Sequence, residues 1–166
     1  MAGRLFADAM LGALARWLRV LGLDTAYDPG LDDRALVALA AAEGRTILTR
    51  DRKLLERRLA RDHLLVRSGR VPEQLRQVLD ELALRPDPAG LFTRCLRCNT
   101  PLVPVDAATA RQHVPPFVAR TQESFRRCPG CGRYYWRATH VTRMERWLAA
   151  AGVALGAKAF APGSDS

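Results

Sequence analysis

The sequence has no long apolar run, no recognisable leader and almost no lysine. No stretch approaches the roughly 20 apolar residues that a membrane-spanning helix needs. The amino terminus lacks a basic segment followed by an apolar run and a cleavage site of small residues. These absences predict a cytoplasmic protein with no membrane partner. Lysine occurs only as Lys53 and Lys158, so arginine carries the basic charge, and genomic base composition is one source of such a bias.

Cysteine is absent from the first part of the chain, and acidic residues are scarce in the second. Residues 1–88 contain 15 basic and 13 acidic residues, a net charge of +2, whereas residues 89–166 contain 11 and 4, a net charge of +7. The total of +9 and the isoelectric point of about 10.4 favour a polyanionic partner. Metal cations would bind the acidic part and nucleic-acid phosphate the basic part. The alternative is two domains whose solvated surfaces differ.

Short apolar strands alternate with helical patterns through residues 1–88. We expect strands at residues 4–6, 25–27, 46–49 and 64–66, and helices at residues 11–21, 33–43, 51–61 and 71–84. The third helix is expected to turn Leu54, Leu55 and Leu59 inward. Asp32 or Asp33 can cap the second helix. This alternation predicts parallel β-α units and therefore an α/β fold with three layers.

The composition changes at a linker rich in proline, residues 85–90. We therefore divide the chain into an α/β domain at residues 1–88, a small zinc ribbon at residues 89–148 and a disordered tail at residues 149–166.

All four cysteines lie in the second module, as Cys95-x-x-Cys98 and Cys128-x-x-Cys131. Two such knuckles supply four thiolates to one tetrahedral zinc ion, and a complete set of four leaves the metal no open position for catalysis. We predict a structural zinc site. Two disulfides or a redox dithiol are the alternatives. A cytosolic chain disfavours the former, and the absence of a βαβ context disfavours the latter.

The backbone around the knuckles also has suitable residues. Asn99 can adopt the left-handed conformation after the first knuckle, and Gly130 and Gly132 ease the second turn. The knuckles are further apart than is usual, so the hairpin between them must carry an insertion.

Arginines and aromatic residues interleave in the ribbon. Arginine pairs with phosphate and aromatic rings stack on bases, a combination used on single strands. The alternative is that the aromatic rings fill the core of the ribbon, and we expect some of each. The predicted RNA-binding residues here are Arg126, Arg127, Arg133, Trp136 and Arg137.

Three carboxylates follow three of the expected strands. Asp8 follows the first, Asp33 with Asp32 beside it follows the second, and Asp51 follows the third. In a parallel sheet these positions share the carboxyl edge, where such folds place their sites. Mg²⁺ or Mn²⁺ would suit three converging carboxylates and could activate water for phosphodiester hydrolysis. The alternative for each aspartate is that it only caps a helix.

These motifs together resemble the Mut-seven C-terminal RNase family. The segments that carry the resemblance are residues 6–22, 33–36, 48–51, 95–99, 114–116 and 135–136. The family is described as a PIN-like RNase domain fused to a zinc ribbon. The resemblance therefore implies a short parallel sheet with an acidic site for a divalent metal, and RNA as substrate. The residues that match its acidic and basic positions are Asp8, Asp33, Asp51, Arg16, Arg19 and Arg50.

The leading hypothesis is thus a metal-dependent endoribonuclease in which water is the nucleophile and the zinc ribbon assists RNA binding. The first alternative is a non-catalytic RNA-binding protein that retains the PIN-like fold. A receiver-like signalling domain is a third hypothesis. It is disfavoured because that fold places two adjacent acids after its first strand, whereas Asp8 stands alone.

Overall fold

A computed structural model describes residues 3–137 and 140–153 of the chain. The amino-terminal module is built on a four-stranded parallel sheet of strand order β2-β1-β3-β4. The strands are β1 (Leu5–Ala7), β2 (Thr25–Tyr27), β3 (Thr46–Thr49) and β4 (His63–Leu65). The predicted α/β fold with a short parallel sheet is confirmed.

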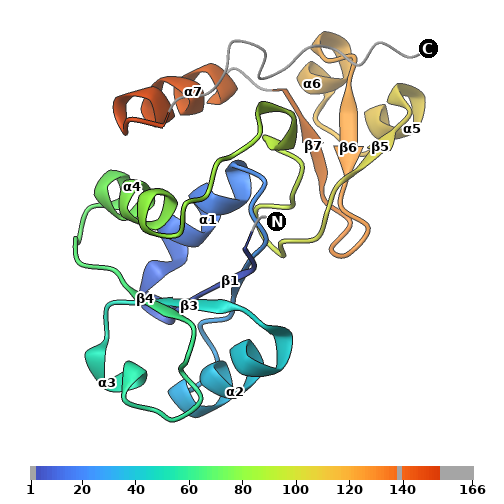
Figure 1. Ribbon diagram of the computed structural model, residues 1–166. Coiled ribbons are helices and arrows are strands. Elements are labelled where there is room, and N and C mark those ends of the chain that lie inside the picture. Colours follow the sequence, from blue (N-terminus) through green and yellow to red (C-terminus); the bar gives the residue numbers. More distant parts are fainter. Residues whose placement is uncertain (1–2, 138–139, 154–166) are drawn as a thin grey trace.

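Helices connect the strands and cover both faces of this sheet (Figure 1). The short 3₁₀ helix η1 (Ala9–Leu11) leads into α1 (Gly12–Val20), and the others are α2 (Asp33–Glu43), α3 (Arg52–Leu55) and α4 (Val71–Glu81). Helices α1 and α4 cover one face, and α2 and α3 the other. None of the helices in the described part of the chain is long and apolar enough to cross a membrane.

The third helix is shorter than predicted. It ends at Leu55, and hydrogen-bonded turns follow, in which Arg57 N–H donates to the Leu54 carbonyl and Ala60 N–H to the Arg57 carbonyl. Leu59 was expected to point inward, and it is 50% exposed. The prediction was wrong because these turns carry the chain back to the sheet, so that Ala60, not Leu59, is buried.

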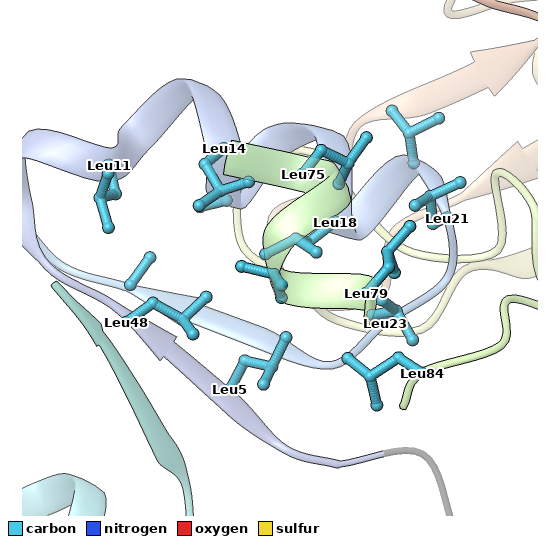
Figure 2. Close-up of a cluster of buried hydrophobic side chains, with 14 of the residues drawn as sticks. Leu5, Leu11, Leu14, Leu18, Leu21, Leu23, Leu48, Leu75, Leu79 and Leu84 are labelled. Carbon is cyan, nitrogen blue, oxygen red and sulfur yellow. The ribbon is translucent and has the colours of Figure 1, made fainter. Parts of the chain in front are cut away.

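Two hydrophobic clusters lie on opposite faces of the sheet because successive strand side chains point to opposite sides. Leu5 and Leu48 belong to the larger cluster, whereas their neighbours Phe6 and Ile47 belong to the smaller one. In the larger cluster, leucines of α1 and α4 pack against the strand leucines (Figure 2). These leucines recur at helical spacing, which is why the helices were predictable.

The second module is a three-stranded antiparallel sheet of order β5-β6-β7. It begins after the short 3₁₀ helix η2 (Pro88–Gly90), and its strands are β5 (Val103–Val105), β6 (Phe125–Arg127) and β7 (Tyr134–Trp136). The short helices α5 (Ala107–Arg111) and α6 (Pro116–Thr121) separate β5 from β6. They form the insertion that the long separation of the knuckles predicted.

The last helix, α7 (His140–Ala150), returns to the amino-terminal module. The ring of Trp147 stacks on Trp17 of α1 with centroids 3.9 Å apart and planes inclined by 10°. Leu148, Ala151 and Val153 are buried in the larger hydrophobic cluster. The prediction of a disordered tail from residue 149 is therefore wrong for residues 149–153, because these apolar side chains bury in a core that lies far away in sequence. The rest of that tail, residues 154–166, lies outside the described residues.

The first knuckle docks on the amino edge of the parallel sheet, where β2 begins. Arg19 donates from Nη1 to the carbonyls of Leu96 and Arg97, at 3.0 Å each. The side-chain oxygen of Asn99 accepts from Thr25 N–H at 3.0 Å. The two modules are thus joined by hydrogen bonds, at the edge of the sheet opposite to the carboxyl ends of the strands.

Asp24 strengthens this junction. Its Oδ1 accepts from Asn99 Nδ2 and from Arg45 Nη1, at 2.7 Å each. Burial raises the pKa of the Asp24 carboxyl, but the hydrogen bonds from Arg45 and Asn99 and the nearby positive charges outweigh it. The net effect is a pKa below the ordinary value, which keeps Asp24 an ionised acceptor.

Candidate nuclease site and metal centre

Asp8 follows β1 at the carboxyl edge of the parallel sheet and is 8% exposed. Its Oδ1 accepts from Ala9 N–H at 2.6 Å, which caps η1, and its Oδ2 accepts from the Thr49 hydroxyl at 2.8 Å. Its own N–H donates to the carbonyl of Leu48 in β3 at 2.9 Å. Pairing of the two central strands therefore holds this carboxylate in place.

Thr49, the last residue of β3, connects Asp8 to Asp51. Thr49 is fully buried, and its hydroxyl donates to Asp8 and accepts from Asp51 N–H at 3.0 Å. The carboxylate of Asp51 caps α3 by accepting from Lys53 N–H at 2.8 Å. Two of the predicted acidic residues thus lie on either side of one buried hydroxyl group. Each carboxylate oxygen can accept two hydrogen bonds, so capping leaves acceptor capacity at both.

The structure separates the roles of Asp32 and Asp33. Asp32 is the helix cap, because its Oδ1 accepts from Ala35 N–H at 2.7 Å. Asp33 is the first residue of α2, with a side chain 45% exposed and an oxygen 3.9 Å from Arg57 Nη2. An exposed ion pair at this distance holds its partners weakly, so the carboxylate of Asp33 stays accessible.

The three predicted acidic residues are not brought together as a ready metal site. Within residues 3–137 and 140–153, the four cysteines form the group of three or more potential ligands that lie close enough together to hold one ion. The three aspartates, which all lie within these described residues, do not form such a group. Asp8 and Asp51 share Thr49, whereas the contact found for Asp33 is with Arg57.

Tyr27 closes over the start of α1 beside Asp8. Its hydroxyl donates to the Ala9 carbonyl at 2.9 Å, and a Cβ added at Gly12 would lie 2.7 Å from that hydroxyl oxygen. The ring can approach this closely only because Gly12 has no side chain.

We therefore expect Gly12→Ala to destabilise the protein by about 1–3 kcal/mol through overpacking against Tyr27. Urea unfolding followed by circular dichroism measures this. Gly69→Ala is the matched control, because a Cβ there meets Arg50 at an ordinary contact of 3.7 Å, and it should be close to neutral. A Gly12→Ala protein as stable as the wild type would contradict the expectation.

The three predicted basic partners have different positions. Arg16 on α1 and Arg50 after β3 are exposed, and the guanidinium of Arg50 lies beside Gly69 in the loop after β4. Arg19 is only 4% exposed, and its Nε donates to the Thr25 carbonyl at 2.9 Å. Its guanidinium is engaged inside the protein, so the RNA contact expected of Arg19 does not suit this position.

The four cysteine sulfurs lie within 4.8 Å of one another. Cys95 and Cys131 sulfurs are 3.6 Å apart, and Cys98 and Cys128 sulfurs are 3.4 Å apart. Zinc–sulfur bonds of about 2.3 Å place tetrahedral sulfurs roughly 3.8 Å apart, so the donor set fits a zinc ion. The structure supports a site that can hold such a metal.

The thiol pKa values point to the same need for a cation. Burial raises the pKa of Cys98, but hydrogen bonds with Thr100 and with the neighbouring thiols have the larger effect and lower it to about 6. A hydrogen bond from Arg133 N–H lowers the pKa of Cys131, yet burial and the adjacent sulfurs raise it to about 11. Thiolates packed this closely repel one another, and a bound metal cation removes that repulsion.

The knuckle backbone has the expected conformation. Asn99 is left-handed with φ 69°, and Gly132 has φ 77°. A Cβ at Gly130 would lie 2.6 Å from Thr100 Oγ1, so this glycine permits the close approach of the two knuckles.

The predicted RNA-binding residues of the ribbon are distributed over both faces of its sheet. Arg126 pairs with Tyr135 and Phe125 with Trp136, so these two pairs face opposite sides. Phe125 is buried, and Tyr134 stacks on His113 with centroids 5.0 Å apart. Arg126 and Trp136 are half-buried, and the exposed members of the predicted set are Arg127, Arg133 and Arg137.

Comparison with protein families matches the chain to the model described as the Mut7-C RNAse domain, over residues 3–148. The chain belongs to this family. Neither the curated proteins nor the solved structures contain a match to the chain. Membership in the Mut7-C RNAse domain family indicates a ribonuclease-type activity with RNA as substrate. This match also agrees with the resemblance to the same family that residues 6–22 and the first knuckle showed in the sequence.

Sequence reasoning about this Mut7-C RNAse domain missed Thr49 and Tyr27. Neither carries a charge, and a threonine at the end of a strand is expected for its β propensity alone. The available signal was position, because Thr49 lies two residues before Asp51 at the same sheet edge.

Proposed function

We propose that this Mut7-C RNAse domain protein is a divalent-metal-dependent endoribonuclease whose reaction takes place at the carboxyl edge of the parallel sheet. The observation that carries the proposal is the linkage of Asp8 and Asp51 through the buried hydroxyl of Thr49. It supports a site in which the carboxylate of Asp8 and the backbone of Asp51 are held by one hydroxyl group at the edge where parallel sheets bind substrates. A cytoplasmic location remains part of the proposal.

Asp8, Asp33 and Asp51 would hold Mg²⁺ or Mn²⁺, since carboxylate oxygens are the donors that these hard cations prefer. Such an ion supplies a lowered pKa for bound water and a positive charge near the leaving oxygen. The hydroxyl of Thr49 orients the carboxylate of Asp8, and the hydrogen bond by which Asp51 caps α3 orients the carboxylate of Asp51. Arg16 and Arg50 are exposed arginines on elements next to this edge, where they can contact phosphate.

The ribbon would add affinity for RNA through Arg126, Arg127, Arg133 and Arg137, with Trp136 between them in sequence. Because the first knuckle docks on the amino edge of the sheet, the ribbon and the acidic edge lie at opposite ends of the strands. An RNA that contacts both must extend along the amino-terminal module, so we propose an extended single strand as substrate.

The test is cleavage of a mixed cellular RNA pool by purified protein with Mg²⁺ or Mn²⁺, beside an Asp8→Asn/Asp51→Asn double variant. We expect metal-dependent cleavage that the variant slows by about a hundredfold or more. The control is Asp62→Asn/Asp80→Asn, which removes the same charge from exposed residues away from this edge. Cleavage that persists in the Asp8/Asp51 variant would point to another site or to contamination.

One observation favours the alternative of a non-catalytic RNA-binding protein. Asp8 is almost buried and both its oxygens already accept hydrogen bonds, and among the described residues the aspartates do not form a metal-sized cluster. RNA binding without cleavage by the wild type, at any concentration of Mg²⁺ or Mn²⁺, would establish this alternative.

A further inference from the structure

A pocket lies where the two modules meet α7. One wall is the segment that enters the first knuckle, with Phe92 and Leu96. Residues of β6 and β7, among them Arg126 and Tyr135, also line the pocket, as does Met144 of α7. The pocket is partly open to solvent.

The charge of this pocket is of one sign. Among its described lining residues are three arginines, Arg94, Arg126 and Arg137, and no aspartate or glutamate. Arg94 donates to the Gly22 carbonyl at 3.1 Å and to the Asn99 carbonyl at 3.0 Å, so its charge is held at the pocket wall by neutral acceptors. A lining that combines apolar surface with the positive charges of Arg94 and Arg126 suits a ligand with a flat apolar part and an anionic part.

Two aromatic walls are held in place before any ligand arrives. Phe92 has a left-handed backbone with φ 55°, which is unfavourable for a bulky residue, and its N–H donates to the Val20 carbonyl at 2.9 Å. The Tyr135 hydroxyl accepts from Leu96 N–H at 3.2 Å and lies 3.0 Å from Cys95 Sγ. The strained backbone of Phe92 is thus maintained by its contact with α1, and Tyr135 is tied to the knuckle.

We propose that this pocket binds one unpaired base of the RNA, with the flanking phosphates contacting its arginines. Aromatic rings stack on any base, and arginine pairs with phosphate. In a duplex the bases are paired and stacked, so they cannot enter such a pocket. The pocket therefore selects single-stranded RNA, and it includes Phe92 and Arg94, which lie outside the ribbon's strands. This inference rests on the proposed function for its choice of RNA.

The experiment compares binding of a single-stranded RNA of about 12 nucleotides, within the site sizes of single-strand-binding domains, with a duplex of the same length. Fluorescence anisotropy is measured on the full chain carrying Asp8→Asn/Asp51→Asn, so that the RNA is not cut. We expect at least about tenfold tighter binding of the single strand. Phe92→Leu and Arg126→Ala should each weaken single-strand binding by about tenfold and leave duplex binding within about twofold.

The matched control is Arg120→Ala, which removes an exposed arginine of α6 that does not line the pocket. It should lower the affinity for both RNAs slightly and equally, through the loss of one charge. Tyr135 is left unchanged because it contacts Cys95. If Phe92→Leu shifts the melting temperature, Arg126→Ala alone decides, because it removes no core contact.

A single strand that carries 4-thiouridine should crosslink to Phe92, Tyr135 or their immediate neighbours. Crosslinks confined to other parts of the chain, or pocket variants that weaken single-strand and duplex binding equally, would overturn the proposal. The two proposals fail separately. A wild-type protein that cleaves RNA while the pocket variants bind normally disproves the pocket, and single-strand binding through the pocket without any cleavage disproves the nuclease.

Discussion

Protein purified without chelators should carry one zinc ion per chain, and Cys128→Ser should lose both the ion and the folded ribbon. Cys128 is fully buried, its N–H donates to the Arg133 carbonyl at 2.8 Å, and its sulfur accepts from Cys131 N–H at 3.3 Å. The buried apolar residues found between positions 92 and 137 are two cysteines, Ala110 and Phe125. So small a core cannot fold the ribbon alone, and structural zinc supplies about 10–16 kcal/mol in comparable sites.

Elemental analysis measures the zinc, and near-ultraviolet circular dichroism of the ribbon's aromatic residues measures its folding. Cys98→His is the control, because Cys98 is exposed and three cysteines with one histidine form an established zinc set. It should retain zinc and the aromatic signal. A Cys128→Ser protein with unchanged zinc content and unchanged dichroism is the result that would exclude this site.

Arg19→Ala should destabilise the protein by about 3–5 kcal/mol, although Arg19 was predicted from the sequence to contact RNA. Removing it leaves the carbonyls of Thr25, Leu96 and Arg97 without their charged donor inside the protein, and hydrogen bonds to charged groups contribute about 1.5–3 kcal/mol each. In a chain of this size the melting temperature should fall by about 10 °C. Scanning calorimetry measures both.

Arg16→Ala is the matched control, one turn earlier on α1 and exposed. It should change stability by less than about 0.5 kcal/mol while weakening RNA binding. Arg19→Lys keeps the positive charge but not the forked guanidinium, so it should remain destabilised. An Arg19→Lys protein with wild-type stability would show that charge alone accounts for the role of this residue.

The layers of the amino-terminal module could be predicted because each depends on a local pattern. Leu14 and Leu18 recur at helical spacing, and strand residues such as Phe6 and Ile47 occur in short apolar runs, so both kinds of element were correctly expected. The knuckles were equally predictable, because the Cys-x-x-Cys spacing brings two sulfurs to one turn whatever residues surround it. The α3 boundary was not, because Leu54 and Leu59 fit the same periodicity and only packing buries one of them.

The functional residues show the same division. The sequence was sufficient to place Asp8 and Asp51 at one sheet edge, since parallel strands align their carboxyl ends. It could not indicate that Thr49 connects them, because a neutral threonine has no distinguishing pattern. Nor could it distinguish Arg16 from Arg19, because both carry the same charge on the same helix. Two of the carbonyls that Arg19 contacts lie 77 and 78 residues away in the sequence.

Fold class, the four-cysteine centre and the acidic edge followed from composition and spacing because residues near one another in the chain specify them. The docking of the ribbon on the amino edge, the return of α7 to stack Trp147 on Trp17, and the pocket between these parts followed only from the packed molecule. Those features are contacts between segments far apart in sequence. Their free energy comes from burying surfaces that match in three dimensions, and no local pattern records that match.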